Sequence, residues 1–220
     1  MIPKTKDLYK TENSIAYGYI TRFEYPWEAL SGISEEILRI GRELGGELFC
    51  EAFDGVWIAK SARVAKSAFI VGPCIIDEGA EVRHCAFIRG GAIVGKGAVV
   101  GNSTELKNCI LFDGVQVPHY NYVGDSILGY KAHLGAGAIT SNVKSDKSLV
   151  VIKGDGIELA TGLKKCGAFL GDLVEVGCGT VLNPGTVIGS SSSVYPLSST
   201  RGVIAPDSIY KNSGEVAKRK

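Results

Sequence analysis

The fold is decided by the stretch from Ile58 to Pro118, which reads IAKSARVAKSAFIVGPCIIDEGAEVRHCAFIRGGAIVGKGAVVGNSTELKNCILFDGVQVP. Every sixth residue before the proline is apolar: Ile58, Val64, Ile70, Ile76, Val82, Ile88, Val94, Val100, Leu106 and Phe112. Four residues after most of these comes a small residue: Ala62, Ala68, Cys74, Ala80, Ala86, Ala92, Ala98 and Thr104. A fixed short period indicates a repeat fold. Because strand side chains alternate with a period of two, each six-residue repeat sends the same positions inward. The stretch therefore predicts a β-solenoid with about 18 residues, or three hexads, in each triangular coil.

The chain is expected to be all-β, with additions at both ends of the solenoid. Residues 1–55 are predicted to form an N-terminal arm and a capping helix, and residues 56–198 the solenoid. An inserted loop, 141–166, interrupts the hexads with a hairpin, after which they resume at Leu170, Val176, Leu182, Ile188 and Val194. The polar residues 199–220 are predicted to form a tail.

One amphipathic helix is predicted before the solenoid. Ser31 or Ser34 would cap its start, and Gly45 with Gly46 would end it. Its apolar residues fall on one stripe: Ile33, Ile37, Ile40 and Leu44. Since terminal repeats need caps, the helix is expected to cover the first coil and shield its open edge. The aromatic segment 1–30 shows no clear period and is predicted to be an extended arm.

The hexad register changes near Pro118. The aliphatic positions that follow are Val123, Leu128 and Leu134, so a five-residue spacing replaces six at this place. Irregularities in solenoids tend to mark loops or functional positions. The change surrounds His119, one of three histidines in the chain.

The composition restricts the classes of binding partner and the cellular compartment that we expect for this protein. The 220 residues carry a formal net charge of +1, which gives no reason to expect nucleic acid or an anionic membrane. No apolar run is long enough to span a bilayer or to serve as a signal peptide. The six cysteines contain no C-x-x-C pair, so they are expected to be reduced thiols in a cytoplasmic protein.

Residues 117–140, VPHYNYVGDSILGYKAHLGAGAIT, together with Ser141 and Asn142, carry a specific motif: H-x-x-Y-[LV]-G-D, then G-A-G-x-I-T-x-N. The chain resembles the left-handed parallel β-helix hexapeptide-repeat acyltransferases. Among these it is similar to the acetyltransferase half of the bacterial enzyme that makes UDP-N-acetylglucosamine and of archaeal sugar-1-phosphate nucleotidylyltransferase/acetyltransferases. The similarity covers residues 82–142 well and the later hexads loosely. The left hand of the helix is what this resemblance implies.

The resemblance implies roles for single residues. His119 matches the family's catalytic base, and Glu105 falls where the family has an acid close to that base. Arg89 and Lys107 match phosphate-binding residues, and Tyr122 a substrate-contacting tyrosine. Asn142 matches an asparagine near the acetyl group, and Ala136 a backbone contact to coenzyme A. Two positions depart from the pattern: His133 replaces a substrate-binding asparagine, and Cys178 replaces a serine near coenzyme A.

The spacing of two cations supports a phosphate site independently. Arg89 and Lys107 are one coil apart, and each directly follows an aliphatic hexad residue. They should therefore stack on one face, as a pair suited to phosphate, although solvated surface cations are the alternative.

The activity implied is acetyl-CoA-dependent N-acetylation of an amino-sugar phosphate, such as glucosamine 1-phosphate, by a homotrimer with sites between adjacent prisms. A histidine can take the proton from the sugar ammonium, and a backbone amide of the turn Gly135–Gly137 can stabilise the oxyanion. The chain lacks the L-x-A-G-x-G-T nucleotide loop of the family's other half, so no pyrophosphorylase activity is expected.

Three alternatives remain open. A non-catalytic scaffold or subunit partnering a nucleotidyltransferase would keep the motif without turnover. A γ-type carbonic anhydrase shares the fold, but it needs two zinc histidines five residues apart, and the gaps between His84, His119 and His133 do not fit. No tightly bound metal is therefore expected. A longer acyl group or a hydroxyl acceptor is the third alternative.

Overall fold

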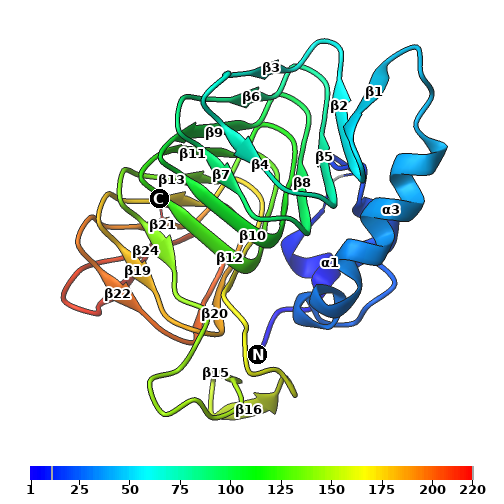
Figure 1. Cartoon of the computed structure of the whole chain (residues 1–220). Helices are drawn as coiled ribbons and strands as arrows, with labels where there is room; N and C mark the ends of the chain where they lie inside the picture. The colour runs from blue at the N-terminus through cyan, green and yellow to red at the C-terminus, as the bar shows by residue number, and fades with distance from the viewer. Residues whose placement is uncertain (11, 220) are drawn as a thin grey trace.

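The computed structural model describes residues 1–10 and 12–219, and the chain in it winds into a three-sided prism of parallel strands (Figure 1). Each coil contributes one strand to each of three faces, which we call A, B and C in the order the chain visits them. This is the left-handed parallel β-helix that the hexads and the resemblance predicted.

The three faces are built as follows. Face A contains β2 (Val56–Ala59), β5 (Cys74–Ile76), β8 (Ala92–Val94), the second halves of β10 (Glu105–Leu111) and β12 (Tyr122–Leu128), β17 (Ala168–Leu170), β20 (Thr186–Ile188) and β23 (Val203–Ile204). Face B contains β3 (Arg63–Val64), β6 (Glu81–Val82), β9 (Val99–Asn102), β11 (Gln116–His119), β13 (His133–Leu134), β18 (Glu175–Val176), β21 (Ser193–Val194) and β24 (Ser208–Tyr210). Face C contains β4 (Phe69–Ile70), β7 (Phe87–Ile88), the first halves of β10 and β12, β14 (Ile139–Thr140), β19 (Val181–Leu182) and β22 (Ser199–Thr200).

Of the expected register changes, the five-residue step from Val123 to Leu128 is confirmed, whereas the one expected at Pro118 lies instead between Leu106 and Leu111. Leu106 pairs with Val123 and Leu111 with Leu128, so five-residue steps occur inside both β10 and β12. Val117, not Pro118, pairs with the interior residue Val100. Phe112 leaves the hexad series and stacks on Tyr9 at 5.0 Å. The shortened corner is possible because Asn108 and Asp125 adopt positive φ, a conformation that Asn and Asp tolerate better than most residues.

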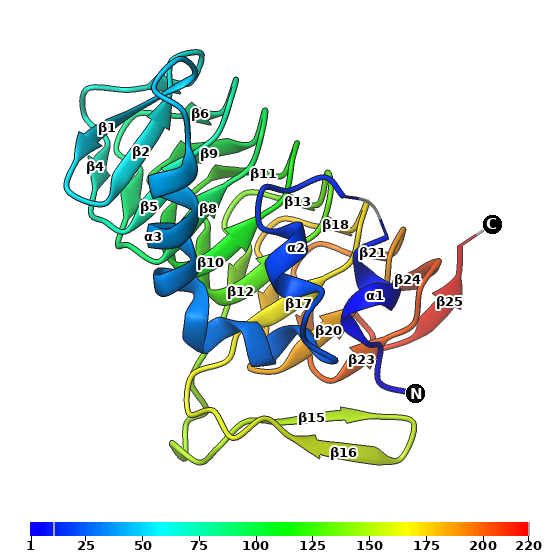
Figure 2. The same cartoon turned by 90° about the vertical axis from the view of Figure 1, so that its right-hand side faces the viewer.

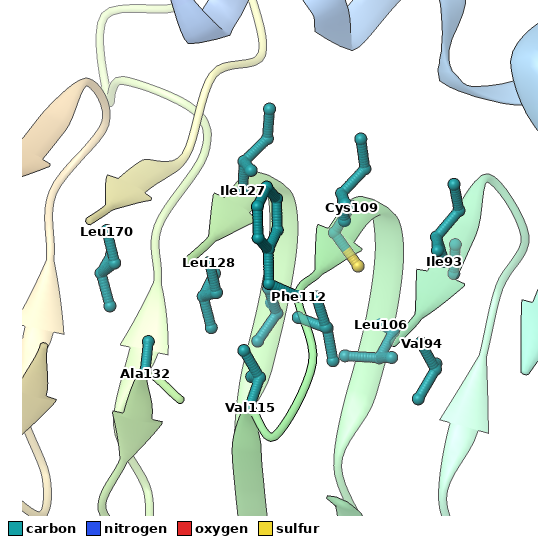
Figure 3. Close-up of a cluster of buried hydrophobic side chains, with 14 of the residues drawn as sticks. Ile93, Val94, Leu106, Cys109, Phe112, Val115, Ile127, Leu128, Ala132 and Leu170 are labelled. Carbon is teal, nitrogen blue, oxygen red and sulfur yellow. The ribbon is translucent and has the colours of Figure 1, made fainter. Parts of the chain in front are cut away.

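Face A is covered by helices, which explains its composition. Its strands are apolar at successive positions, as in Cys74–Ile76 and Ala92–Val94, because a parallel sheet buried on both sides needs no polar face. Ile93 and Ile127 point outward to the helices, whereas Val94, Leu128 and Leu170 point into the prism (Figure 3).

The N-terminal segment does not form an extended arm. It folds into α1 (Thr5–Leu8), α2 (Tyr17–Ile20) and the 3₁₀ helix η1 (Pro26–Gly32), which lie along face A (Figure 2). Tyr9 is fully buried with its hydroxyl donating to the Ile127 carbonyl, and Trp27 contacts the Phe169 ring at 6.0 Å. Burial of these large aromatic surfaces outweighs the entropy of an extended chain.

The predicted helix is present as α3 (Ile33–Glu43), but its start and its place differ from expectation. Its N-cap is Gly32, with no side-chain capping bond from Ser31 or Ser34. It packs along β5, β8 and β10 of face A instead of covering the end of the first coil. At Gly41 the helix lies so close to the Trp57 ring that an added Cβ would overlap it. Strand β1 (Phe49–Phe53) pairs antiparallel with β2 and shields that edge.

The far end of the solenoid extends beyond the expected boundary. Residues 199–210 continue the coils as β22, β23 and β24, and β25 (Val216–Lys218) pairs antiparallel with β24. The segment predicted to be a tail therefore continues the coils over residues 199–210, because Ile204 and Tyr210 continue the apolar positions; Lys220 lies outside the described residues. The predicted hairpin is confirmed as β15 (Val151–Gly154) and β16 (Ile157–Ala160). Within residues 1–10 and 12–219, no helix is long and apolar enough to cross a membrane.

Candidate functional site

The edge between faces B and C carries three of the predicted site residues in one column. We define the B–C column as His84, Asn102, His119, Ala136 and Cys178, which occupy the same position in successive coils. A backbone ladder fixes this alignment: the amides of Tyr120, Gly137 and Gly179 donate to the carbonyls of Asn102, His119 and Ala136 at 2.8–3.0 Å. Coils are spaced by about 4.8 Å, so the column presents His119, Ala136 and Cys178 in sequence along the prism.

His119 lies at the end of β11 and is exposed. Its amide donates to the Asn121 side chain at 3.1 Å and its carbonyl accepts from Gly137 at 3.0 Å, so its backbone is held from both sides. Over the described chain, the imidazole has no hydrogen-bond partner. Both ring nitrogens are therefore free to meet a ligand.

Ala136 and Cys178 are exposed on the same edge, on the side of His119 that leads to the C-terminal coils. Gly135 permits the close stacking here, because a Cβ at this residue would lie 2.6 Å from the Cys178 amide nitrogen. The structure thus brings the predicted base and both predicted coenzyme contacts onto one edge.

The corner between faces C and A holds the predicted phosphate residues, as their spacing indicated. Ile88 pairs with Leu106, and the Arg89 amide donates to the Leu106 carbonyl, which aligns Arg89 with Lys107. Both side chains line a shallow hollow of about 340 Å³ over Gly90 and Gly91. Gly90 has φ of +90° and its position leaves no room for a Cβ, which would lie 2.5 Å from the Gly72 carbonyl oxygen.

Glu105 is engaged with Arg89 and not with His119. The Arg89 guanidinium donates to the Glu105 carboxylate at 2.8 Å, and this carboxylate raises the pKa of Arg89 further above its usual range. The guanidinium side chain remains 48% exposed, so several of its five donors can still reach a ligand. The expectation that Glu105 orients the imidazole is not met by these contacts.

Lys107 is held by a carboxylate to which the sequence analysis gave no role. Its ammonium donates to both oxygens of Asp125, at 2.8 and 3.0 Å, and the Asp125 side chain is only 4% exposed. The amides of Asn108 and Asn142 donate to the same carboxylate, at 2.9 and 2.5 Å. The Asp125 carboxylate therefore accepts hydrogen bonds from one ammonium and two amides, at the corner where a five-residue step replaces a hexad.

Tyr122 completes this cluster. Asn142 donates to the Tyr122 hydroxyl at 3.1 Å. Burial of the phenol, with the Asp125 and Glu105 carboxylates nearby, raises the pKa of Tyr122, so the hydroxyl keeps its proton at neutral pH. Gly124 makes room for the ring, because a Cβ there would lie 2.4 Å from the hydroxyl oxygen.

His133 lies apart from this cluster. It is on face B, where its Nδ1 lies 2.8 Å from the Glu175 carboxylate. Both residues line a groove of about 880 Å³ together with Lys131 and Arg219. The structure therefore does not bring His133 to the side chains of Arg89 and Lys107.

Two features of the sequence point to Asp125, although the sequence analysis gave this residue no role. Asp125 is the last residue of the H-x-x-Y-[LV]-G-D motif, and both five-residue steps span Asn108 or Asp125. Within the part of the chain that the structure describes, no group of three or more His, Cys, Asp or Glu side chains could hold a metal ion.

A family model described as the GMPPB C-terminal domain matches residues 70–195 of the chain. A protein named bifunctional protein GlmU from Methanococcus aeolicus is 31% identical over 222 residues, covering 92% of this chain and 50% of its own length. A bifunctional sugar-1-phosphate nucleotidylyltransferase/acetyltransferase from Sulfurisphaera tokodaii is 34% identical over 97 residues, covering 44% of this chain and 24% of its own length. The chain thus spans half or less of these relatives. Among solved structures, the acetyltransferase domain of PglB from Neisseria gonorrhoeae with acetyl coenzyme A aligns at a TM-score of 0.30 and 16% identity, over 72% of this chain and 55% of that one.

Proposed function

The chain belongs to the GMPPB C-terminal domain family, and from that membership we propose that it is an acetyl-CoA-dependent N-acetyltransferase acting on an amino-sugar phosphate such as glucosamine 1-phosphate. One relative is named a bifunctional sugar-1-phosphate nucleotidylyltransferase/acetyltransferase, which supports a sugar phosphate as the substrate class. The observation that carries the proposal is the arrangement around face C. An unpartnered imidazole stands at one edge and a two-cation hollow lies at the opposite corner.

In the proposed reaction His119 takes the proton from the substrate ammonium, which frees the amine to attack the thioester carbonyl. Histidine suits this step because its ordinary pKa lies near neutrality, and a positioned base contributes about 10²–10⁴-fold to rate. The C–S bond then breaks, the released thiolate of coenzyme A takes the proton held by His119, and the second proton of the attacking nitrogen passes to water. No covalent bond to the enzyme is required.

Arg89 and Lys107 would bind the sugar phosphate. Arginine offers paired donors that match phosphate oxygens, and lysine adds a point charge. Glu105 would position Arg89 through the bond at 2.8 Å, a role that replaces the one first expected for it. Tyr122 and Asn142 would contact the acceptor, whereas His133 would act only if substrate also reaches face B.

Acetyl-CoA would lie along the B–C column, where Ala136 and Cys178 follow His119. A preorganised backbone amide of the Gly135–Gly137 turn would stabilise the oxyanion. We also propose a homotrimer in the cytoplasm; all six cysteines are free thiols, as a reducing compartment requires.

The decisive experiment measures release of coenzyme A thiol from acetyl-CoA with glucosamine 1-phosphate, galactosamine 1-phosphate and UDP-linked amino sugars. We expect turnover with one acceptor class, and a loss of about 10²–10⁴-fold in kcat for His119→Ala. His84→Ala is the matched control, since His84 occupies the same column two coils away and should leave turnover unchanged. Turnover that survives in His119→Ala would refute the mechanism.

A non-catalytic scaffold is the second candidate, and one observation favours it. Both cations of the hollow are already paired with carboxylates, Arg89 with Glu105 and Lys107 with Asp125. Absence of turnover with every acceptor in the presence of acetyl-CoA would support this reading over the enzyme.

A further inference from the structure

A second set of reactive side chains lies on the B–C edge, outside the proposed acetyl-transfer site. Cys85 Sγ is 3.2 Å from Nε2 of His84, and Nδ1 of the same ring is 2.6 Å from the Ser67 hydroxyl oxygen. The Cys85 amide also donates to that oxygen, at 3.3 Å. All three residues are exposed. The arrangement is a thiol, a base and a group that orients the base, which is the pattern of an activated nucleophile.

The fold itself holds these groups together. Cys85 has φ of +57°, and the corner residues of the next coils, Ser103 and Tyr120, have nearly the same conformation. The His84 carbonyl is fixed by the Asn102 side-chain amide at 3.0 Å and by the Ser103 amide at 3.4 Å. The thiol and the imidazole, although adjacent in sequence, are thus both set by the solenoid corner and not by a mobile loop.

The hydrogen bonds permit the tautomer that a nucleophile needs. A serine hydroxyl has two acceptor lone pairs, so Ser67 can accept from the Cys85 amide and also from Nδ1–H of His84. Nε2 then carries the lone pair and can accept the proton of the Cys85 thiol. We propose that Cys85 is a reactive thiol, activated by His84 and oriented through Ser67, that undergoes thiol–disulfide exchange with low-molecular-weight disulfides.

Charged residues flank the pair in sequence. Arg83 directly precedes His84, and its guanidinium donates to Glu81 at 3.0 Å, with Arg63 at 3.7 Å from the same carboxylate. Lys66 directly precedes Ser67. Arg83→Gln therefore changes a neighbouring charge without removing a contact of the imidazole.

The step balances without any further reagent. The thiol proton moves to Nε2 of His84, and the thiolate attacks one sulfur of a disulfide R–S–S–R. A Cys85–S–S–R bond forms while the original S–S bond breaks. The leaving R–S⁻ takes the proton from the imidazolium. The Cys85 sulfur is oxidised and the small disulfide is reduced to one thiol, which is ordinary exchange chemistry.

The chain contains its own controls. Cys50 and Cys178 are exposed and have no histidine within hydrogen-bond distance, whereas Cys74, Cys109 and Cys166 are buried. Burial raises the pKa of Cys74 to about 12 and that of Cys166 to about 12, so these thiols should stay inert.

The test is the alkylation rate of each cysteine by iodoacetamide at pH 7, measured by peptide mass spectrometry on the reduced, folded protein. A free cysteine is only a few per cent thiolate at this pH, so full activation would give at most about 30-fold; we expect Cys85 to react about 10-fold faster than Cys178. His84→Gln should bring the Cys85 rate to within about 2-fold of Cys178, and Ser67→Ala should lower it by less. Arg83→Gln should lower it least, since it alters a nearby charge without touching the imidazole.

A second arm uses oxidised glutathione as the disulfide, with the mixed disulfide read as a mass gain that dithiothreitol reverses. We expect it first on the peptide with Cys85, and Cys85→Ser should abolish this modification. Equal rates for Cys85 and Cys178, or a rate unchanged by His84→Gln in a protein with a wild-type unfolding temperature, would overturn the proposal. Neither arm depends on acetyl transfer, so the two proposals can fail separately.

Discussion

Asp125 is the residue on which the C–A corner depends. Its nearly buried carboxylate is the shared acceptor of Lys107, Asn108 and Asn142, and it has positive φ. Asp125→Ala would leave an ammonium and two amides without their acceptor. A fully buried pair costs about 3–5 kcal/mol to break in this way, but Lys107 is 25% exposed, so we expect about 2–3 kcal/mol less stability in urea unfolding.

The control for this variant is Asp207→Ala. Asp207 also has positive φ but is exposed, so the control carries the same backbone strain without the lost acceptor. We expect it to lose about 1 kcal/mol or less. Equal losses in the two variants would show that backbone strain, and not the hydrogen-bonded cluster, accounts for the effect.

Among the elements, the strands of the solenoid could be predicted from sequence and the helices' positions could not. The hexads fix which side chains point inward, because their period matches the pleat of a strand. They say nothing of the outward side of face A, where Ile75, Ile93 and Ile127 are fully buried under the N-terminal helices. The residue before the interior one is apolar in every coil of face A, but it is also apolar at Phe69, Phe87 and Val99 on the other faces. This position therefore does not single out face A as the side that the helices cover.

In the candidate site as well, the sequence predicts how residues align between coils but not which side chains contact one another. Alignment of Arg89 with Lys107 follows from one-coil spacing, so sequence alone predicted it. Partner choice does not follow from spacing: Glu105 lies against Arg89, and His133 against Glu175, because side-chain contacts depend on which residues neighbouring coils present. The five-residue step from Leu106 to Leu111 was also missed, because both Leu111 and Phe112 are apolar and either could have continued the hexads.

Helix α3 should contribute to stability through its apolar stripe. Ile37 is fully buried between the helix and face A. Ile37→Ala removes this contact and leaves a cavity, so we expect a loss of about 2–4 kcal/mol in urea unfolding. Arg42→Ala, an exposed position on the same helix, should change stability by less than about 0.5 kcal/mol. A similarly small effect of Ile37→Ala would mean that the helix is only loosely attached to the solenoid.

At the scale of the whole molecule, the site is open on a single prism. The His119 ring is exposed at the B–C edge, and the Arg89 side chain is 48% exposed at the C–A corner. Electrostatic and hydrogen-bonding groups act most strongly where water is excluded. A neighbouring prism packed beside face C would enclose the groups that one chain leaves in water, which is the physical reason to expect the proposed trimer.

Light scattering after size exclusion should therefore give the mass of three chains of 23.3 kDa each. If the enclosed site forms only between chains, specific acetyl-transfer activity should fall on dilution, at the same protein concentration at which the trimer mass is lost. Enzyme diluted and then reconcentrated should recover its activity, which separates dissociation from denaturation. A monomer with full specific activity would contradict the trimer and would show that one prism holds the acceptor and the coenzyme without a neighbour.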